Sequence, residues 1–219
     1  NTVKTSADAD DAEVAGINKE SALLAPERVR QIAGYVLEHF PRLTKRDVSY
    51  DFRQLLNISA VASAKSKKVT EVRKAQRVRG FNAMFATASI EAARAYYREF
   101  QKQQTDLVPD QRLRVATIFS YQPNQDMEGV SLLPDESMDP GDMNRDDQDF
   151  LADAIADYNE MFNTNYDTSA DSFENYYKDL SLRMKNRELD LVIVVNMFLT
   201  GFDATTLNTL FVDKNLRFH

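Results

Sequence analysis

The most constraining feature of the sequence is a short apolar run, Leu-Val-Ile-Val-Val, at residues 191–195. The run has no polar alternation and is rich in β-branched residues, which is typical of a strand covered on both faces of a parallel sheet. A second strand is expected where Leu210, Phe211 and Val212 follow. Parallel sheets carry their binding sites at strand ends, so we expect a site in the turn between these two strands.

That turn contains Thr200, Gly201, Phe202 and Asp203. Glycine lets a ligand approach the backbone closely, threonine can donate to a phosphate oxygen, and aspartate can accept from a ribose hydroxyl or a neighbouring arginine. The same residues also fit an ordinary turn between a strand and a helix, with the glycine at positive φ and the aspartate as helix cap. The residues alone leave both interpretations open.

Composition limits the class of protein. With 219 residues and 43% hydrophobic content, the chain can bury a substantial core. It has no cysteine, which excludes a disulfide framework and a thiolate metal site, and its two histidines cannot build a His-rich one, so we expect no metal site within the chain itself. No segment approaches the roughly 18 consecutive apolar residues of a membrane span, and the polar N-terminus is no signal peptide.

Charge is strongly segregated along the chain. The formal net charge is −7, but residues 65–79 carry seven Lys/Arg against one Glu, whereas residues 121–160 carry twelve Asp/Glu against Arg145 alone. The basic segment is either a solvated connector or an arm that contacts DNA phosphates and gains affinity by releasing counterions. Its cationic residues are Lys65, Lys67, Lys68, Arg73, Lys74, Arg77 and Arg79.

The N-terminal third differs from the rest, and we divide the chain into a polar and helical lead-in with a basic connector (1–79) and an α/β domain (80–219). Residues 1–20 are polar and receive no function. Pro26 suits the first position of a helix whose apolar residues recur as far as Phe40, and Pro41 is predicted to end it. A short helix is predicted within 42–64, around Phe52, Leu55, Leu56 and Ile58.

The second part begins with a strand and helix unit: a buried strand at 81–86, a turn containing Thr87 and Ser89, and a helix at 90–103. A strand at 113–119 is followed by a long acidic loop at 122–144. Two amphipathic helices come next, marked by aromatic stripes starting at Phe150 and Phe173, which we interpret as core. Thr87 and Ser89 fit helix caps as well as ligand contacts.

Several catalytic signatures are absent. None of the six glycines begins a Gly-x-x-x-x-Gly-Lys-Ser/Thr phosphate loop, and no Glu-x-Lys of a restriction-type nuclease centre occurs. Leu-Leu-Pro-Asp-Glu at 132–136 mimics a Walker B motif, but Pro134 interrupts a strand and the acidic surroundings would repel Mg-ATP, so we reject it. Two histidines in such settings support no Ser/His/Asp triad.

One stretch resembles a known family. Leu-Thr-Gly-Phe-Asp-Ala at 199–204 and Val-Asp-Lys at 212–214 resemble motif V of superfamily 2 helicases, in the form found in the motor (R) subunit of type I restriction enzymes. That family often has proline where this chain has Thr205, which bears on the rigidity of the turn. Most other superfamily 2 helicases have arginine where this chain has Thr200, which favours the restriction branch.

The resemblance implies the second RecA-like domain of a motor: α/β, with a parallel sheet flanked by helices and a helical N-terminal arm. The strand at 81–86 resembles motif IV, which would place Thr87, Ser89 and Thr200 near the nucleic-acid backbone. Gly201 and Asp203 would face ATP in the cleft between two lobes. ATP and Mg would be held mainly by a first lobe outside this chain, and motif VI would follow residue 219, so the chain alone is expected to be inactive.

The resemblance further implies a cytoplasmic, ATP-dependent double-stranded DNA translocase within a site-specific deoxyribonuclease. Its partners would be double-stranded DNA, the first RecA-like lobe of the same parent chain, and the methylation and specificity subunits. Two alternatives stay open: the second lobe of another superfamily 2 helicase or remodeller, and a non-catalytic α/β interaction domain.

Overall fold

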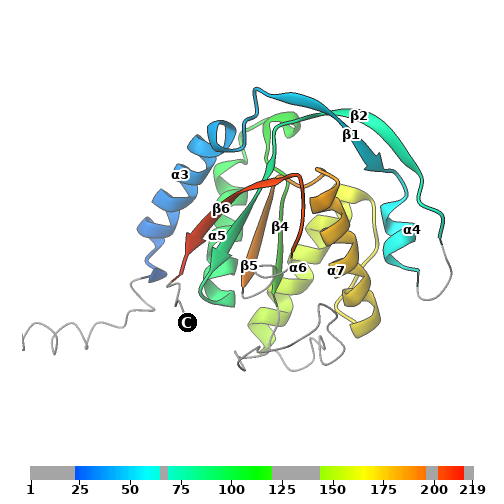
Figure 1. Cartoon of the computed structure of the whole chain (residues 1–219). Coiled ribbons are helices and arrows are strands. Elements are labelled where there is room, and N and C mark those ends of the chain that lie inside the picture. Colours follow the sequence, from blue (N-terminus) through cyan, green and yellow to red (C-terminus); the bar gives the residue numbers. More distant parts are fainter. Residues whose placement is uncertain (1–22, 65–68, 120–143, 196–201, 215–219) are drawn as a thin grey trace, which may run out of the picture.

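The central element of the fold is a parallel sheet (Figure 1). The computed structural model describes residues 23–64, 69–119, 144–195 and 202–214. Within them, four parallel strands lie in the order β4-β5-β3-β6 and helices flank the sheet. The strands are β3 (Asn82–Thr87), β4 (Val115–Phe119), β5 (Leu191–Val195) and β6 (Leu207–Asp213). The predicted α/β fold is confirmed.

The apolar run that predicted a buried strand is β5, which lies between β4 and β3. No residue of β5 is more than 4% exposed, as expected for a strand covered on both faces. β6 is an edge strand of this sheet. Its side chains alternate between partly buried and exposed, and Leu210 and Val212 are exposed. The difference in pattern therefore follows from position in the sheet.

Three helices pack close to the sheet: α5 (Ile90–Gln103), α6 (Arg145–Phe162) and α7 (Ala170–Lys185). Phe85 of β3 makes edge contacts with Tyr96 and Phe100 of α5, with ring centroids 4.7 and 5.9 Å apart. Phe119 of β4 stacks on Phe150 of α6 at 5.5 Å. The aromatic stripes are core, as predicted.

Helix α3 (Pro26–Leu43) precedes the predicted domain but shares its core. Its buried stripe packs against α5, beside the sheet (Figure 1). The prediction that Pro41 ends the helix is wrong, because Pro41 lies inside it. Proline removes only one hydrogen bond there, and Thr44 closes the last turn by donating its backbone N–H and its hydroxyl to the Phe40 carbonyl, at 2.9 and 2.6 Å.

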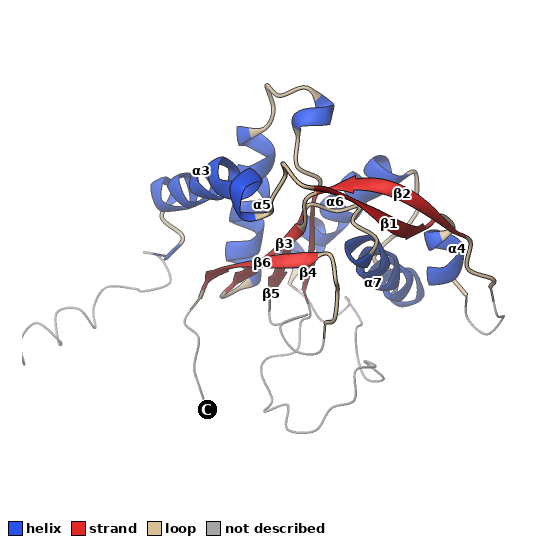
Figure 2. Cartoon of the chain, turned by 45° about the horizontal axis from the view of Figure 1, so that its top comes forward, coloured by secondary structure: helices blue, strands red, loops and turns tan. Residues whose placement is uncertain are grey.

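Strands β1 (Ser49–Leu55) and β2 (Arg73–Arg79) form a two-stranded antiparallel ribbon, hereafter the ribbon. Figures 1 and 2 show it extending from the sheet toward a short helix, α4 (Ile58–Ala62). The short helix predicted within 42–64 is present as α4, which begins at Ile58, but its predicted extent is wrong because Phe52 and Leu55 belong to β1. In the described part of the basic segment, residues 69–72 have no regular structure and Arg73–Arg79 is strand β2.

A hydrogen-bonded network at the amino edge of the sheet joins the ribbon to β5. Arg187 follows α7 in a left-handed conformation (φ 62°), and the N–H groups of Arg187 and Glu188 close the helix on Met184 and Arg183. The buried Arg187 guanidinium donates to the carbonyls of Arg79, Gly80 and Leu189 at 3.0 to 3.1 Å.

Asp190 completes this network. Its carboxylate accepts from Arg187 at 2.8 Å, from Arg46, and from the backbone N–H of Arg114 at 2.8 Å. Three segments that are distant in the sequence, around residues 46, 114 and 187–190, therefore meet at one carboxylate. We call Arg46, Gly80, Arg187 and Asp190 the amino-edge network.

Some predicted features lie outside the described residues. These are the lead-in at 1–20, residues 122–143 of the acidic loop including 132–136, and Lys65, Lys67, Lys68, Thr200 and Gly201. Among the helices that the structure describes, none is long and apolar enough to cross a membrane.

Candidate nucleic-acid and nucleotide interface

Thr87 ends β3 at the carboxyl edge of the sheet and is completely buried. Its hydroxyl donates to the carbonyls of Ser89 and Val194, at 3.3 and 3.4 Å. In this conformation the hydroxyl is used within the protein and has no exposed surface. The predicted DNA contact of Thr87 stays a prediction, and it requires the turn after β3 to open.

Ser89 is the N-cap of α5, as its position in the sequence predicted. Its Oγ accepts a hydrogen bond from the Ala92 N–H at 3.2 Å, which satisfies one of the unpaired donors of the first turn. The side chain is only partly buried, so its role as a cap leaves its predicted DNA contact open.

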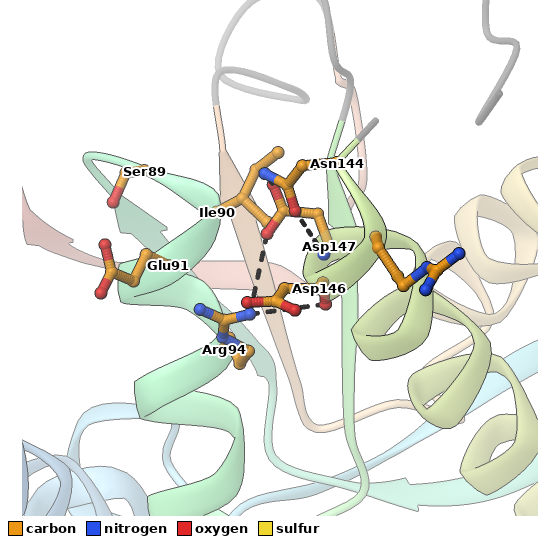
Figure 3. A pocket seen from close by; sticks show the side chains of 8 residues that line it. Ser89, Ile90, Glu91, Arg94, Asn144, Asp146 and Asp147 are labelled. Atoms are coloured by element: carbon orange, nitrogen blue, oxygen red, sulfur yellow. Dashed lines mark hydrogen bonds and ion pairs between the residues drawn. The ribbon is translucent and has the colours of Figure 1, made fainter. Parts of the chain in front are cut away.

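A polar cavity of about 460 Å³ lies between the starts of α5 and α6 (Figure 3). Asn144 caps α6 by accepting from the Asp147 N–H at 2.9 Å, as Ser89 caps α5. Arg94 of α5 reaches across, 3.4 Å from the Asp146 carbonyl and 3.9 Å from the Asp147 carboxylate. The lining residues are Ser89, Ile90, Glu91, Arg94, Asn144, Arg145, Asp146 and Asp147.

Two helix N-termini adjoin this cavity, but carboxylates that would repel an anion line it as well. Three acidic side chains line it against two arginines, and Arg94 is already engaged by α6. The electrostatic potential in the cavity therefore does not favour phosphate binding, although the helix N-termini contribute partial positive charge. Sequence reasoning missed this pairing, because nothing in the sequence places residue 144 beside residue 89.

Asp203 lies on the segment that returns from β5 to β6. Residues 202–204 have no regular structure, a turn follows at 205–206, and β6 begins at Leu207, so the predicted alternative of a helix cap is wrong. Thr206 is fixed at the amino edge, where its hydroxyl donates to the Met184 carbonyl at 2.9 Å and its carbonyl accepts from Asn82 at 2.9 Å.

The Asp203 carboxylate is exposed and accepts no hydrogen bond within the described part of the chain. Next to it, the Phe202 ring lies 5.3 Å from the Lys185 ammonium. An exposed acceptor fits the predicted contact with a ribose hydroxyl of ATP held mainly by another domain.

The end of β6 carries an ion pair that sequence reasoning missed. Asp213 accepts from both terminal nitrogens of Arg28 in α3 and from the Tyr96 hydroxyl at 2.6 Å. Burial alone would raise the pKa of Asp213, but hydrogen bonds from Arg28 and Tyr96 outweigh it and hold the pKa below its ordinary value. Burial and the hydrogen bond to Asp213 raise the pKa of Tyr96. Asp213 therefore joins α3 to the carboxyl edge.

The cations of β2 divide between the two faces of the ribbon. Successive side chains of a strand alternate, so Arg73, Arg77 and Arg79 share one face and Lys74 lies on the other with the buried Val78. The structure brings three of the predicted DNA-binding residues together and separates the fourth. The ribbon is a separate sheet from the one that contains Thr87, so these four cations are not strand neighbours of Thr87 or Ser89.

Comparison with known proteins decides the family. A family model described as type I restriction enzyme subunit R domain 3 matches residues 79–219. The chain belongs to this family. The resemblance inferred from the motif V-like stretch is thereby confirmed.

Curated relatives agree with this assignment to the R-subunit family. The endonuclease subunit of a type I restriction enzyme from Staphylococcus aureus (strain MRSA252) is 38% identical over 145 residues, 65% of this chain and 14% of the relative. The corresponding subunit from Staphylococcus saprophyticus is 32% identical over 208 residues, 94% of this chain and 18% of the relative. The chain thus spans less than a fifth of the length of these relatives.

Proposed function

We propose that this chain is the second RecA-like lobe of an ATP-dependent translocase that moves double-stranded DNA within a type I restriction endonuclease. The observation that carries the proposal is the R-subunit family match over a parallel sheet that has no phosphate loop of its own. A second lobe needs no such loop, because the first lobe holds the phosphates.

In this proposal the carboxyl edge of the sheet faces the DNA track and the cleft between the lobes. Ser89 and Thr200 contact the nucleic-acid backbone, and Thr87 does so once the turn after β3 opens. Gly201 allows close approach of the ligand to the backbone. The exposed Asp203 carboxylate accepts a hydrogen bond from the ribose and ties the nucleotide state to the position of the lobe.

Cations within the basic segment contribute affinity for duplex DNA that does not depend on base sequence. Lys65, Lys67 and Lys68 add to the positive charge of this segment. ATP, with Mg, supplies the free energy of phosphoanhydride hydrolysis when bound. The other proposed partners are the methylation and specificity subunits and the first lobe of the same parent chain, in the cytoplasm.

The deciding experiment measures ATP turnover and DNA movement by the full-length subunit reconstituted with its partner subunits. DNA-stimulated ATPase together with displacement of a triplex-forming strand is expected. The 219-residue chain alone should hydrolyse no ATP. An inactive complex would favour a non-catalytic interaction domain, and robust turnover by the isolated chain would contradict the one-lobe proposal.

A further inference from the structure

The ribbon has two chemically different faces. Its inner face carries Tyr50, Phe52 and Val78; the Tyr50 ring stacks on Phe81 at 5.3 Å and its hydroxyl donates to the Gly80 carbonyl at 3.2 Å. The outer face carries arginines from both strands, and pairing places Arg53 opposite Ala75 and Arg77 opposite Asp51. The inner face anchors the ribbon and the outer face is charged.

The outer arginines keep much of their hydrogen-bonding capacity. Arg53 makes no side-chain hydrogen bond or ion pair within the described residues, and Arg79 donates one hydrogen bond, from Nε to the Arg46 carbonyl at 3.1 Å. Arg77 lies 3.6 Å from Asp51, but both side chains are about 70% exposed, so the pair is weak. Arg73 is the most engaged, through Glu71 and the Arg53 carbonyl.

The backbone beneath these arginines is held at both ends. At one end the Arg187 guanidinium donates to the Arg79 carbonyl at 3.0 Å. At the other, the Asn186 side chain pairs with the backbone N–H and carbonyl of Leu55, at 2.6 and 3.0 Å. The charged face is therefore fixed before any partner binds, which lowers the entropy lost on binding.

The composition of the face selects the kind of partner. It exposes no aromatic or large aliphatic side chain, which argues against base stacking and against the apolar centre of a protein interface. Arginines two residues apart along a strand are spaced by about 7 Å, and their planar guanidinium groups suit bidentate contacts with phosphate. A phosphate backbone matches this surface better than an acidic protein segment does.

We propose that the outer face of the ribbon, formed by Arg53, Arg77 and Arg79 with Arg73 at its end, binds the phosphate backbone of duplex DNA, and that Lys74 on the opposite face takes no part. This rests on the proposed function and deepens it by adding Arg53 and selecting one face. It also explains how a chain of net charge −7 can approach DNA, because the cations are gathered on one surface.

The test uses the full-length subunit and a short duplex of mixed sequence, with affinity measured by fluorescence anisotropy between about 50 and 200 mM salt. Arg53→Ala combined with Arg77→Ala should flatten the slope of log K against log salt by about 1.8. Both side chains are exposed, so the melting temperature should not change.

Two controls make the result specific. Lys74→Ala removes one positive charge from β2 on the other face, and its slope should equal that of the unmodified protein. Arg53→Lys with Arg77→Lys keeps both charges and should keep most of the slope. An unchanged slope for the double alanine variant, or a flattening of about 0.9 by Lys74→Ala, would overturn the proposal.

Two further outcomes separate this inference from the proposed function. If the double alanine variant binds duplex normally but no longer assembles with the methylation and specificity subunits, the face is a protein interface and the inference fails. If the unmodified protein shows no DNA-stimulated ATPase while the slopes behave as predicted, the ribbon contact stands and the motor function fails.

Discussion

The two edges of the sheet are built differently. At the amino edge, the amino-edge network joins the ribbon, α7 and β5 through buried groups, most of them charged. At the carboxyl edge, the described contacts are mainly helix caps, the Asp213 ion pair and an open polar cavity. Buried charged contacts are thus concentrated at the amino edge, which lies away from Thr87 and Ser89 and which also holds the ribbon in place. The opposite edge can then change shape without unfolding the domain.

The largest expected effect is at Arg187. Arg187→Ala removes four hydrogen bonds and one of the two arginines that balance the buried Asp190 charge. It should lower the free energy of unfolding by about 3 to 4 kcal/mol. Urea unfolding of this chain measures it. Arg187→Gly should lose about 1 kcal/mol less, because glycine relieves the left-handed backbone. A loss below 1 kcal/mol for the alanine variant would show that the network is not the stable edge.

Gly80 gives the second prediction. Its φ is +57°, and a Cβ there would lie 2.7 Å from the Thr44 carbonyl oxygen, so Gly80→Ala should cost about 2 to 3 kcal/mol. Gly34→Ala is the matched control, because this glycine is helical and its added Cβ meets only the end of Gln103 at 3.4 Å. The control should be neutral or stabilise by up to about 1 kcal/mol. Similar melting temperatures for the two variants would contradict the role given to Gly80.

Asp213 tests the carboxyl edge by pH. Because its pKa is lowered in the folded state, its stabilisation is fully present above the unfolded pKa near 4 and is lost as pH falls through the folded value. Asp213→Asn should cost about 1 to 2 kcal/mol at pH 7. That difference should stay constant from pH 7 to 5 and shrink below about pH 4. A difference that already shrinks between pH 7 and 5 would assign the effect to another group.

Asp203 should have the smallest effect on stability. Its carboxylate is exposed and caps no helix, so Asp203→Asn should leave the melting temperature unchanged. In the reconstituted complex, DNA-stimulated ATPase and translocation should fall together. Normal ATPase at an unchanged melting temperature would remove the proposed coupling role, and a loss of both activity and melting temperature would show that Asp203 also stabilises the fold.

The sequence predicted those parts of the fold where one periodicity is strong. The buried strands and the helix at 90–103 follow from apolar runs and stripes that have one structural solution. The ribbon was missed because Tyr50 and Phe52 alternate over too short a stretch to outweigh a helical interpretation. The helix end predicted at Pro41 is wrong because proline is tolerated in the last turn, which the hydrogen bond from Thr44 to Phe40 holds in place.

The candidate site was predicted less completely than the fold. The Ser89 cap follows from local chemistry, since the acceptor and donor are three residues apart. Arg28 and Asp213, or Arg46 and Asp190, are brought together only by the tertiary fold, and no local pattern marks them. Asp203 was assigned a possible helix cap because a parallel strand is usually followed by a helix, whereas residues 202–206 lead directly into β6.

The pairing of Arg28 with Asp213 also has a consequence for biosynthesis. The two residues are separated by 185 positions, and Arg46 and Asp190 by 144, so the contacts that hold α3 and the ribbon in place join opposite ends of the chain. Such a topology has a high contact order and folds slowly, because long loops must close before their contacts form. During synthesis α3 emerges before β6, so the ion pair between Arg28 and Asp213 cannot form until β6 has also emerged.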